Sequence, residues 1–101
     1  MPTEPAVTFR PATVDDAAAV VGLWSDAGAH PTTTDDAASV IALVGRDPGA
    51  LVLAEADGLL VGSLVCGWDG WRGNMYRLVV LPAYRRRGIA TALVGRALLR
   101  L

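Results

Sequence analysis

The chain has 101 residues, 52% of them hydrophobic, and a positive mean hydropathy. This length allows one domain, and the apolar content excludes a disordered polypeptide and predicts a substantial core. The formal net charge of −1 conceals a strong asymmetry. Residues 1–70 contain two arginines and all ten carboxylates, whereas residues 71–101 contain seven arginines and no carboxylate. The last third is therefore suited to bind a negatively charged molecule.

Several classes of protein are excluded by residues that are rare or missing. The chain has no lysine, which excludes the phosphate-binding P-loop motif and Schiff-base chemistry. Its single cysteine, Cys66, cannot form an internal disulfide or a metal cluster, and it is expected to be a buried thiol in a reducing cytosol. The longest apolar stretches contain a carboxylate, and residues 1–5 lack the features of a signal peptide. We therefore expect a cytoplasmic protein with no membrane partner.

The first half of the chain predicts a strand followed by two helices. Residues 7–10 alternate between apolar and polar side chains, which predicts a short strand. Thr13 is expected to cap a helix that ends at Gly28. Helical spacing predicts that this helix buries Val20, Leu23, Trp24 and Ala27. A loop at residues 29–32 follows, and a second helix ends near Gly45. Its expected cap is Thr33 or Thr34 with Asp35 and Asp36, and its expected buried residues are Ala37, Val40, Ile41 and Val44.

The second half predicts three strands and a helix. Apolar runs at residues 51–56 and 59–67 are joined by Asp57-Gly58, a strong two-residue hairpin signal. A longer turn at residues 68–74 leads to a strand over Met75–Leu81. The final helix starts at Gly88 and is expected to bury Ile89, Leu93, Ala97 and Leu101. The order β-α-α-β-β-β-α predicts an α/β fold with a mixed sheet and mostly antiparallel strands.

Residues 85–90, Arg-Arg-Arg-Gly-Ile-Ala, lie between the last strand and the last helix. A turn from a strand into a helix directs several unpaired amide N–H groups at one point, which favours an anion and phosphate above all. Arginine is suited to bidentate contacts with phosphate. The alternative reading of this stretch is a run of solvated charges.

The order of elements, together with residues 78–90, resembles the GNAT superfamily of acyl-CoA-dependent N-acetyltransferases. The family signature is Arg or Gln, two residues, Gly, one residue, then Gly or Ala, and it is matched by Arg85, Gly88 and Ala90. The Val-Val-x-Pro strand end, Tyr84 before the arginines and the helix that follows also match the family. The resemblance implies one N-acetyltransferase domain over residues 1–101, with acetyl-CoA as co-substrate and no metal.

The resemblance also implies positions for the cofactor. The pantetheine arm would pair with the backbone of Leu78, Val79 and Val80. The pyrophosphate would rest on the turn and helix start formed by Arg85, Arg86, Arg87, Gly88, Ile89, Ala90 and Thr91. Arg86 or Arg87 would reach the 3′-phosphate. Gly88 would let the backbone approach phosphate closely, and the helix dipole would favour negative charge.

The expected reaction is direct attack of a primary amine, from a small molecule or a protein, on acetyl-CoA in a ternary complex. It needs a neutral amine, a polarised thioester carbonyl and a stabilised thiolate. Many relatives place a carboxylate on the fourth strand, where this chain has Tyr76 and Arg77. The candidate catalytic residues are therefore Tyr76 and Asp69, with a strand aromatic and a turn-forming aspartate as the alternative readings. His30 is in a loop that lines the acceptor pocket in relatives, although such a residue is more often solvated.

The family fold continues with a fifth strand, a helix and a closing hairpin, which we expect this chain to lack. The fourth strand would then be an exposed apolar edge. A homodimer that completes the sheet, a truncated non-catalytic acyl-CoA-binding or interaction module, and a fragment of a longer protein are the alternatives. Nucleic acid is not an expected partner, because the first two-thirds of the chain is acidic enough to repel it.

Overall fold

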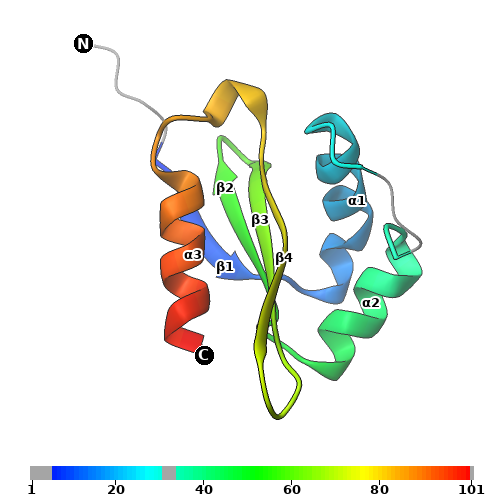
Figure 1. Cartoon of the computed structure of the whole chain (residues 1–101). Coiled ribbons are helices and arrows are strands. Elements are labelled where there is room, and N and C mark those ends of the chain that lie inside the picture. Colours follow the sequence, from blue (N-terminus) through cyan, green and yellow to red (C-terminus); the bar gives the residue numbers. More distant parts are fainter. Residues whose placement is uncertain (1–5, 31–33, 101) are drawn as a thin grey trace.

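The computed structural model describes residues 6–30 and 34–100 (Figure 1). Its elements are β1 (Thr8–Pro11), a 3₁₀ turn (Val14–Asp16), α1 (Ala17–Asp26), α2 (Ala37–Arg46), β2 (Leu51–Ala56), β3 (Leu59–Trp68), β4 (Gly73–Val80), a second 3₁₀ turn (Pro82–Tyr84) and α3 (Ile89–Arg100). This order confirms the predicted β-α-α-β-β-β-α arrangement. No helix in the described part of the chain has the length and apolar character needed to cross a bilayer.

The four strands form one sheet in the order β1-β2-β3-β4, and each strand is antiparallel to its neighbours. Helices α1 and α2 cover one face of the sheet, and α3 covers the other face (Figure 1). Within the described residues β4 pairs only with β3, so it is an edge strand. The α/β fold class predicted from the sequence is confirmed.

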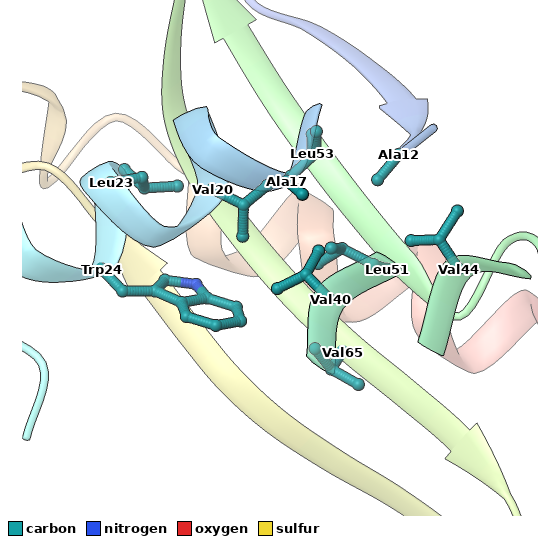
Figure 2. Packing of buried hydrophobic residues seen from close by; sticks show 10 residues of the cluster. All are labelled: Ala12, Ala17, Val20, Leu23, Trp24, Val40, Val44, Leu51, Leu53 and Val65. Carbon is teal, nitrogen blue, oxygen red and sulfur yellow. The ribbon is translucent and has the colours of Figure 1, made fainter. Parts of the chain in front are cut away.

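The core consists of two clusters separated by the sheet, because alternate residues of a strand point to opposite faces. The cluster under α1 and α2, shown in Figure 2, contains Ala12, Ala17, Val20, Leu23, Trp24, Val40, Val44, Leu51, Leu53 and Val65. The cluster under α3 contains Ala54, Ala56, Val61, Leu64, Cys66, Ile89, Leu93 and Ala97. Cys66 is a buried free thiol, as predicted, and burial raises its pKa.

The starts and faces of the first two helices differ in part from the sequence prediction. The 3₁₀ turn precedes α1, and the Thr13 N–H donates to the Asp16 carboxylate at 2.7 Å. The capping residue of α2 is Asp36, which accepts the Ser39 N–H at 2.7 Å, and not Thr34. Thr33 and Leu101 lie outside the described residues.

The predicted buried face of α2 was too wide. Val40 and Val44 are buried, as expected, but Ala37 is exposed and Ile41 is 45% exposed. Positions i and i+4 form one stripe along a helix, and α2 buries the stripe of Val40 and Val44 against the sheet, with Leu43 partly buried beside it. Ala37 and Ile41 form the neighbouring stripe, which faces solvent. On α1 the prediction was better, since Val20, Leu23 and Trp24 are buried and Ala27 lies half-buried at the C-cap.

An irregularity in β4 was not predicted. Ser63 pairs with Val79 and Val65 pairs with Tyr76, so two residues of β4, Arg77 and Leu78, stand opposite one residue of β3. Arg77 has a φ of 54°, which is unusual for a residue with a side chain. Such a β-bulge bends the strand and redirects its side chains. Its second residue, Leu78, is also the first residue of the part of β4 that the sequence assigns to the cofactor.

An ion-pair network joins β1, the start of α1 and β2. The Arg10 guanidinium donates to both Asp16 carboxylate oxygens at 2.8 Å and also to Glu55. The hydrogen bonds from Arg10 lower the pKa of Asp16 to about 2. Because the folded pKa lies below the unfolded one, the stabilisation is present above about pH 4 and is lost as the pH falls toward 2.

Asp16→Asn is therefore expected to reduce the free energy of unfolding at pH 7 by up to about 2 kcal/mol, and by much less at pH 2. Urea unfolding at the two pH values measures both numbers. Asp15→Asn is the matched control, because Asp15 is the exposed carboxylate next to Asp16. An equal loss in the two variants would refute the importance of the network.

Candidate active site

A cavity of about 690 Å³ opens where the end of β4, the loop before α3 and the loop after α1 meet. Its lining residues are Ala27, Gly28, Ala29, Arg77, Leu78, Val79, Val80, Tyr84, Arg85, Arg86, Gly88, Ile89, Ala90 and Thr91. We call it the first cavity. Of the ten residues predicted to contact the cofactor, all except Arg87 line it. The structure thus brings a strand backbone and a helix start to the same space.

The loop before α3 has an unusual backbone. Arg86 has a φ of 65° and Gly88 a φ of 77°, both in the left-handed region. A β-carbon on Gly88 would meet no atom within 4 Å, so glycine is required there by the backbone conformation and not by lack of space. Within residues 6–30 and 34–100, no hydrogen-bond acceptor is found for the amide groups of residues 88–91. These amides are the free donors of a helix N-terminus, which favours an anion.

The three consecutive arginines lie in different surroundings. Arg85 donates from Nε to the Val80 carbonyl at 3.0 Å and from Nη2 to the Ala27 carbonyl at 3.4 Å. It thereby connects the end of β4 to the loop after α1. The Arg87 guanidinium lies over the Tyr84 ring, 5.3 Å from its centroid, and Tyr84 packs against the cluster under α3. Arg86 lines the first cavity.

Close packing of α3 on the sheet positions this loop. A β-carbon on Gly62 of β3 would lie 3.1 Å from the Val79 carbonyl oxygen and 3.3 Å from side-chain carbons of Ile89 and Leu93. Glycine at this position therefore lets the first turns of α3 approach β3 and β4 closely. The amides at the helix start lie beside the end of β4 for this reason.

A second cavity, of about 630 Å³, lies between α1, α2 and the middle of β3 and β4. Its lining residues are Trp24, Thr34, Asp35, Ser39, Val40, Leu43, Val65, Gly67, Tyr76 and Arg77. Arg77 also lines the first cavity, so the two cavities meet at the β-bulge. The Arg77 side chain pairs with Asp35, donates to the His30 carbonyl at 2.8 Å and lies 5.5 Å from the centroid of the Trp24 ring.

Comparison with known proteins assigns a family to this geometry. The model of the Acetyltransferase (GNAT) family matches residues 17–100. The chain belongs to the GNAT family. The match includes both helices over the second cavity and the whole of the loop before α3. The resemblance seen in the sequence is confirmed.

Individual proteins agree with this family assignment. The chain is 39% identical over 82 residues to an acetyltransferase of Pectobacterium atrosepticum and 38% identical to one of Yersinia pestis. In both cases the match covers 81% of this chain and 58% of the relative, so the chain spans little more than half the length of these relatives.

Solved structures of acetyltransferases have a similar fold. The diaminobutyrate acetyltransferase of Paenibacillus lautus, in complex with its substrate and coenzyme A, matches with a TM-score of 0.79, 21% identity and coverage of 94% of this chain and 58% of its own. The PaiA N-acetyltransferase of Thermoplasma acidophilum, in complex with coenzyme A, has a TM-score of 0.80, 14% identity and coverage of 94% and 71%.

The two candidate catalytic residues lie in different places. Tyr76 is on β4, lines the second cavity and is 60% exposed. Asp69 lies in the exposed turn between β3 and β4 and lines neither cavity. Its carboxylate accepts the N–H groups of Arg72 at 2.7 Å and Trp71 at 2.8 Å, and these bonds lower its pKa. The contacts of Asp69 are those of a turn-forming residue, the alternative reading from the sequence.

Sequence reasoning missed the polar groups around the second cavity. His30 was expected near the acceptor, and its backbone carbonyl holds Arg77. Asp35 was read only as a helix cap, whereas its carboxylate pairs with Arg77, which is 42 residues away in the sequence. One feature of the sequence pointed to this ion pair: Arg77 stands where many relatives have a carboxylate. In the described part of the chain no group of three His, Cys, Asp or Glu residues could hold a metal ion.

Proposed function

We propose that this GNAT chain transfers an acetyl group from acetyl-CoA to a primary amine by direct attack in a ternary complex, with the cofactor in the first cavity. The observation that supports this most strongly is the group of unpaired amides at residues 88–91 beside the end of β4. A diphosphate needs such donors, and an extended arm needs a strand edge. The first cavity has both.

The pantetheine arm would lie along Leu78, Val79 and Val80. Leu78 is the second residue of the bulge, and Val79 and Val80 follow it. All three belong to a strand with one neighbour in the described structure, so an extended arm can add to the sheet as a further strand would. The pyrophosphate would contact the amides of the loop and of the first turn of α3. Arg86, at the cavity wall, or Arg87, beside it, would contact the 3′-phosphate.

The chemistry requires few groups from the protein. A backbone N–H near Val79 or Val80 would polarise the thioester carbonyl, and the thiolate that leaves would take a proton. Tyr76 is the proposed proton donor, because it lines the cavity that adjoins the thioester position. No described carboxylate other than Asp35 lines either cavity, and Asp35 is paired with Arg77.

Tyr76→Phe is expected to lower the rate of acetyl transfer by about a hundredfold, since loss of a general acid has an effect of this order. Thiol release from acetyl-CoA with a panel of amines measures it. Acetyl-CoA affinity, measured by calorimetry, should stay unchanged, because Tyr76 does not line the first cavity. Asp69→Asn is expected to disturb the turn and leave transfer largely intact. A larger loss of the transfer rate in Asp69→Asn than in Tyr76→Phe would make Asp69 the catalytic group.

A non-catalytic acyl-CoA-binding module is the second candidate, because among the described residues the only carboxylate that lines either cavity is Asp35, which is paired with Arg77. Calorimetry with acetyl-CoA against dephospho-CoA tests recognition of the cofactor, and thiol release then separates an enzyme from a binder. Binding with no thiol release for any amine would support the module.

The exposed edge of β4 supports a homodimer in which a second copy completes the sheet. Met75 and Leu78 of this strand are 39% and 47% exposed. Light scattering of the purified chain tests this proposal. A single domain over residues 1–101 and a cytoplasmic location remain predictions.

A further inference from the structure

The second cavity lies within reach of the proposed reaction centre. Arg77 forms part of both cavity walls, and on β4 only the other bulge residue, Leu78, separates it from Val79. A molecule held in the second cavity can therefore present a group at the thioester position. If the proposed function holds, the second cavity is where the acceptor is selected.

The walls of this cavity are mainly apolar. Trp24 from α1, Val40 and Leu43 from α2, and Val65 from β3 line it. Figure 2 shows the Trp24 indole facing the side of the core that contains Val40 and Val65. The indole N–H is already used within the protein, because it donates to the buried Ser63 hydroxyl at 2.9 Å. A ligand would therefore meet the apolar surface of the ring and aliphatic side chains.

The charged groups of the cavity neutralise each other. Asp35 is the only described carboxylate in its lining, Arg77 is the only arginine, and the two form an ion pair. Their side chains are 13% and 18% exposed, so solvent screens this pair less than a surface pair. A second ammonium group on an acceptor would find no unpaired carboxylate here, and its burial would be costly.

We propose that the second cavity selects a monoamine with an apolar substituent, aliphatic or aromatic, and discriminates against diamines and polyamines. The substituent would pack against Trp24, Leu43 and Val65, and the amine would point past Arg77 toward Val79. This assignment names an acceptor class for the proposed transfer and depends on that function. Most carboxylates of the acidic first two-thirds of the chain lie outside this cavity, so they do not favour a polyamine within it.

Direct binding tests this preference without requiring turnover. With coenzyme A bound to the full chain, calorimetry should give an affinity for 2-phenylethylamine at least about tenfold higher than for 1,4-diaminobutane, as burial of roughly 60 Å² of additional apolar surface predicts. Equal affinities, or tighter binding of the diamine, would overturn the proposal. A separate titration with coenzyme A tests the cofactor site, so failure of the proposed function is distinguishable from failure of this inference.

A pair of matched variants tests the location. Ser39 lines the cavity, whereas Ala38 is exposed on the same helix and does not. Ser39→Asp and Ala38→Asp both add a carboxylate to the first turn of α2, where the helix dipole tolerates it. Only Ser39→Asp should reduce the preference for the monoamine, by about fivefold or more. A similar change in Ala38→Asp, or no change in a folded Ser39→Asp, would show that selection occurs elsewhere.

Discussion

Gly88→Ala is expected to weaken acetyl-CoA binding by about tenfold or more. Gly88 has a φ of 77°, and a residue with a β-carbon in the left-handed region costs about 1–2 kcal/mol. The loop can relieve this cost by leaving the left-handed region, and this would rotate the amides at residues 88–91 away from the first cavity. Calorimetry with acetyl-CoA and with dephospho-CoA measures the loss, which should be similar for the two ligands because the diphosphate is common to both.

Gly58→Ala is the matched control for this prediction. Gly58 has a φ of 75°, lies in the hairpin between β2 and β3, and has open space around its β-carbon position, as Gly88 has. It does not line the first cavity. Both variants should lose similar stability, but only Gly88→Ala should lose affinity for acetyl-CoA. Equal affinity losses would mean that general destabilisation is responsible, and the phosphate-binding role of the loop would be refuted.

The order of elements could be predicted because each signal is local. Apolar runs and alternating apolar residues indicated the strands, and the Asp57-Gly58 pair indicated a hairpin. Apolar residues at a four-residue spacing indicated α3. The residues that line the first cavity could be predicted from the same kind of local signal. A strand, a turn and a helix start that are consecutive in the sequence must also be neighbours in space, so nine of the ten predicted cofactor residues line one cavity.

The features that sequence reasoning missed depend on contacts between distant segments. The ion pair between Asp35 and Arg77 joins the start of α2 to β4, and the hydrophobic periodicity of the two segments does not predict it. The sequence does not predict the β-bulge either, since arginine is not a residue that usually adopts a positive φ, as Arg77 does. Ile41 was placed in the core because its spacing fits a helical face, but how wide a stripe α2 buries depends on the tertiary packing.

Two of these missed features, the ion pair with Asp35 and the β-bulge, have Arg77 in common. Its backbone carbonyl accepts the Ser63 hydroxyl, its side chain pairs with Asp35, and both cavities include it in their walls. The bulge therefore sets the direction of the segment of β4 that would hold the cofactor arm. The Arg77 side chain lies between that segment and the second cavity. A change in the bulge should affect cofactor binding even where the altered residue lines neither cavity.

Ser63→Ala tests this expectation and should have the second large effect. Ser63 is fully buried, and its hydroxyl accepts the Trp24 indole N–H at 2.9 Å and donates to the Arg77 carbonyl at 2.8 Å. Its removal leaves the buried indole N–H without its acceptor and takes one donor from the part-buried Arg77 carbonyl, so the free energy of unfolding should fall by about 2–3 kcal/mol. Urea unfolding measures this loss. Ser39→Ala, which removes a partly exposed hydroxyl from the same side of the sheet, should cost much less.

The positioning role of Ser63 requires a second effect that lost stability alone would not produce. At a temperature where Ser63→Ala is fully folded, its KM for acetyl-CoA should rise severalfold, because the bulge no longer holds Leu78, Val79 and Val80 in line with the helix start. Trp24→Phe removes the indole donor and part of the buried ring, but it keeps an aromatic face beside Arg77 and the bond from Ser63 to the Arg77 carbonyl, so it should destabilise the chain without the same rise in KM. If Ser63→Ala keeps normal cofactor affinity once folded, the bulge is set by the sheet itself, and the hydroxyl only stabilises it.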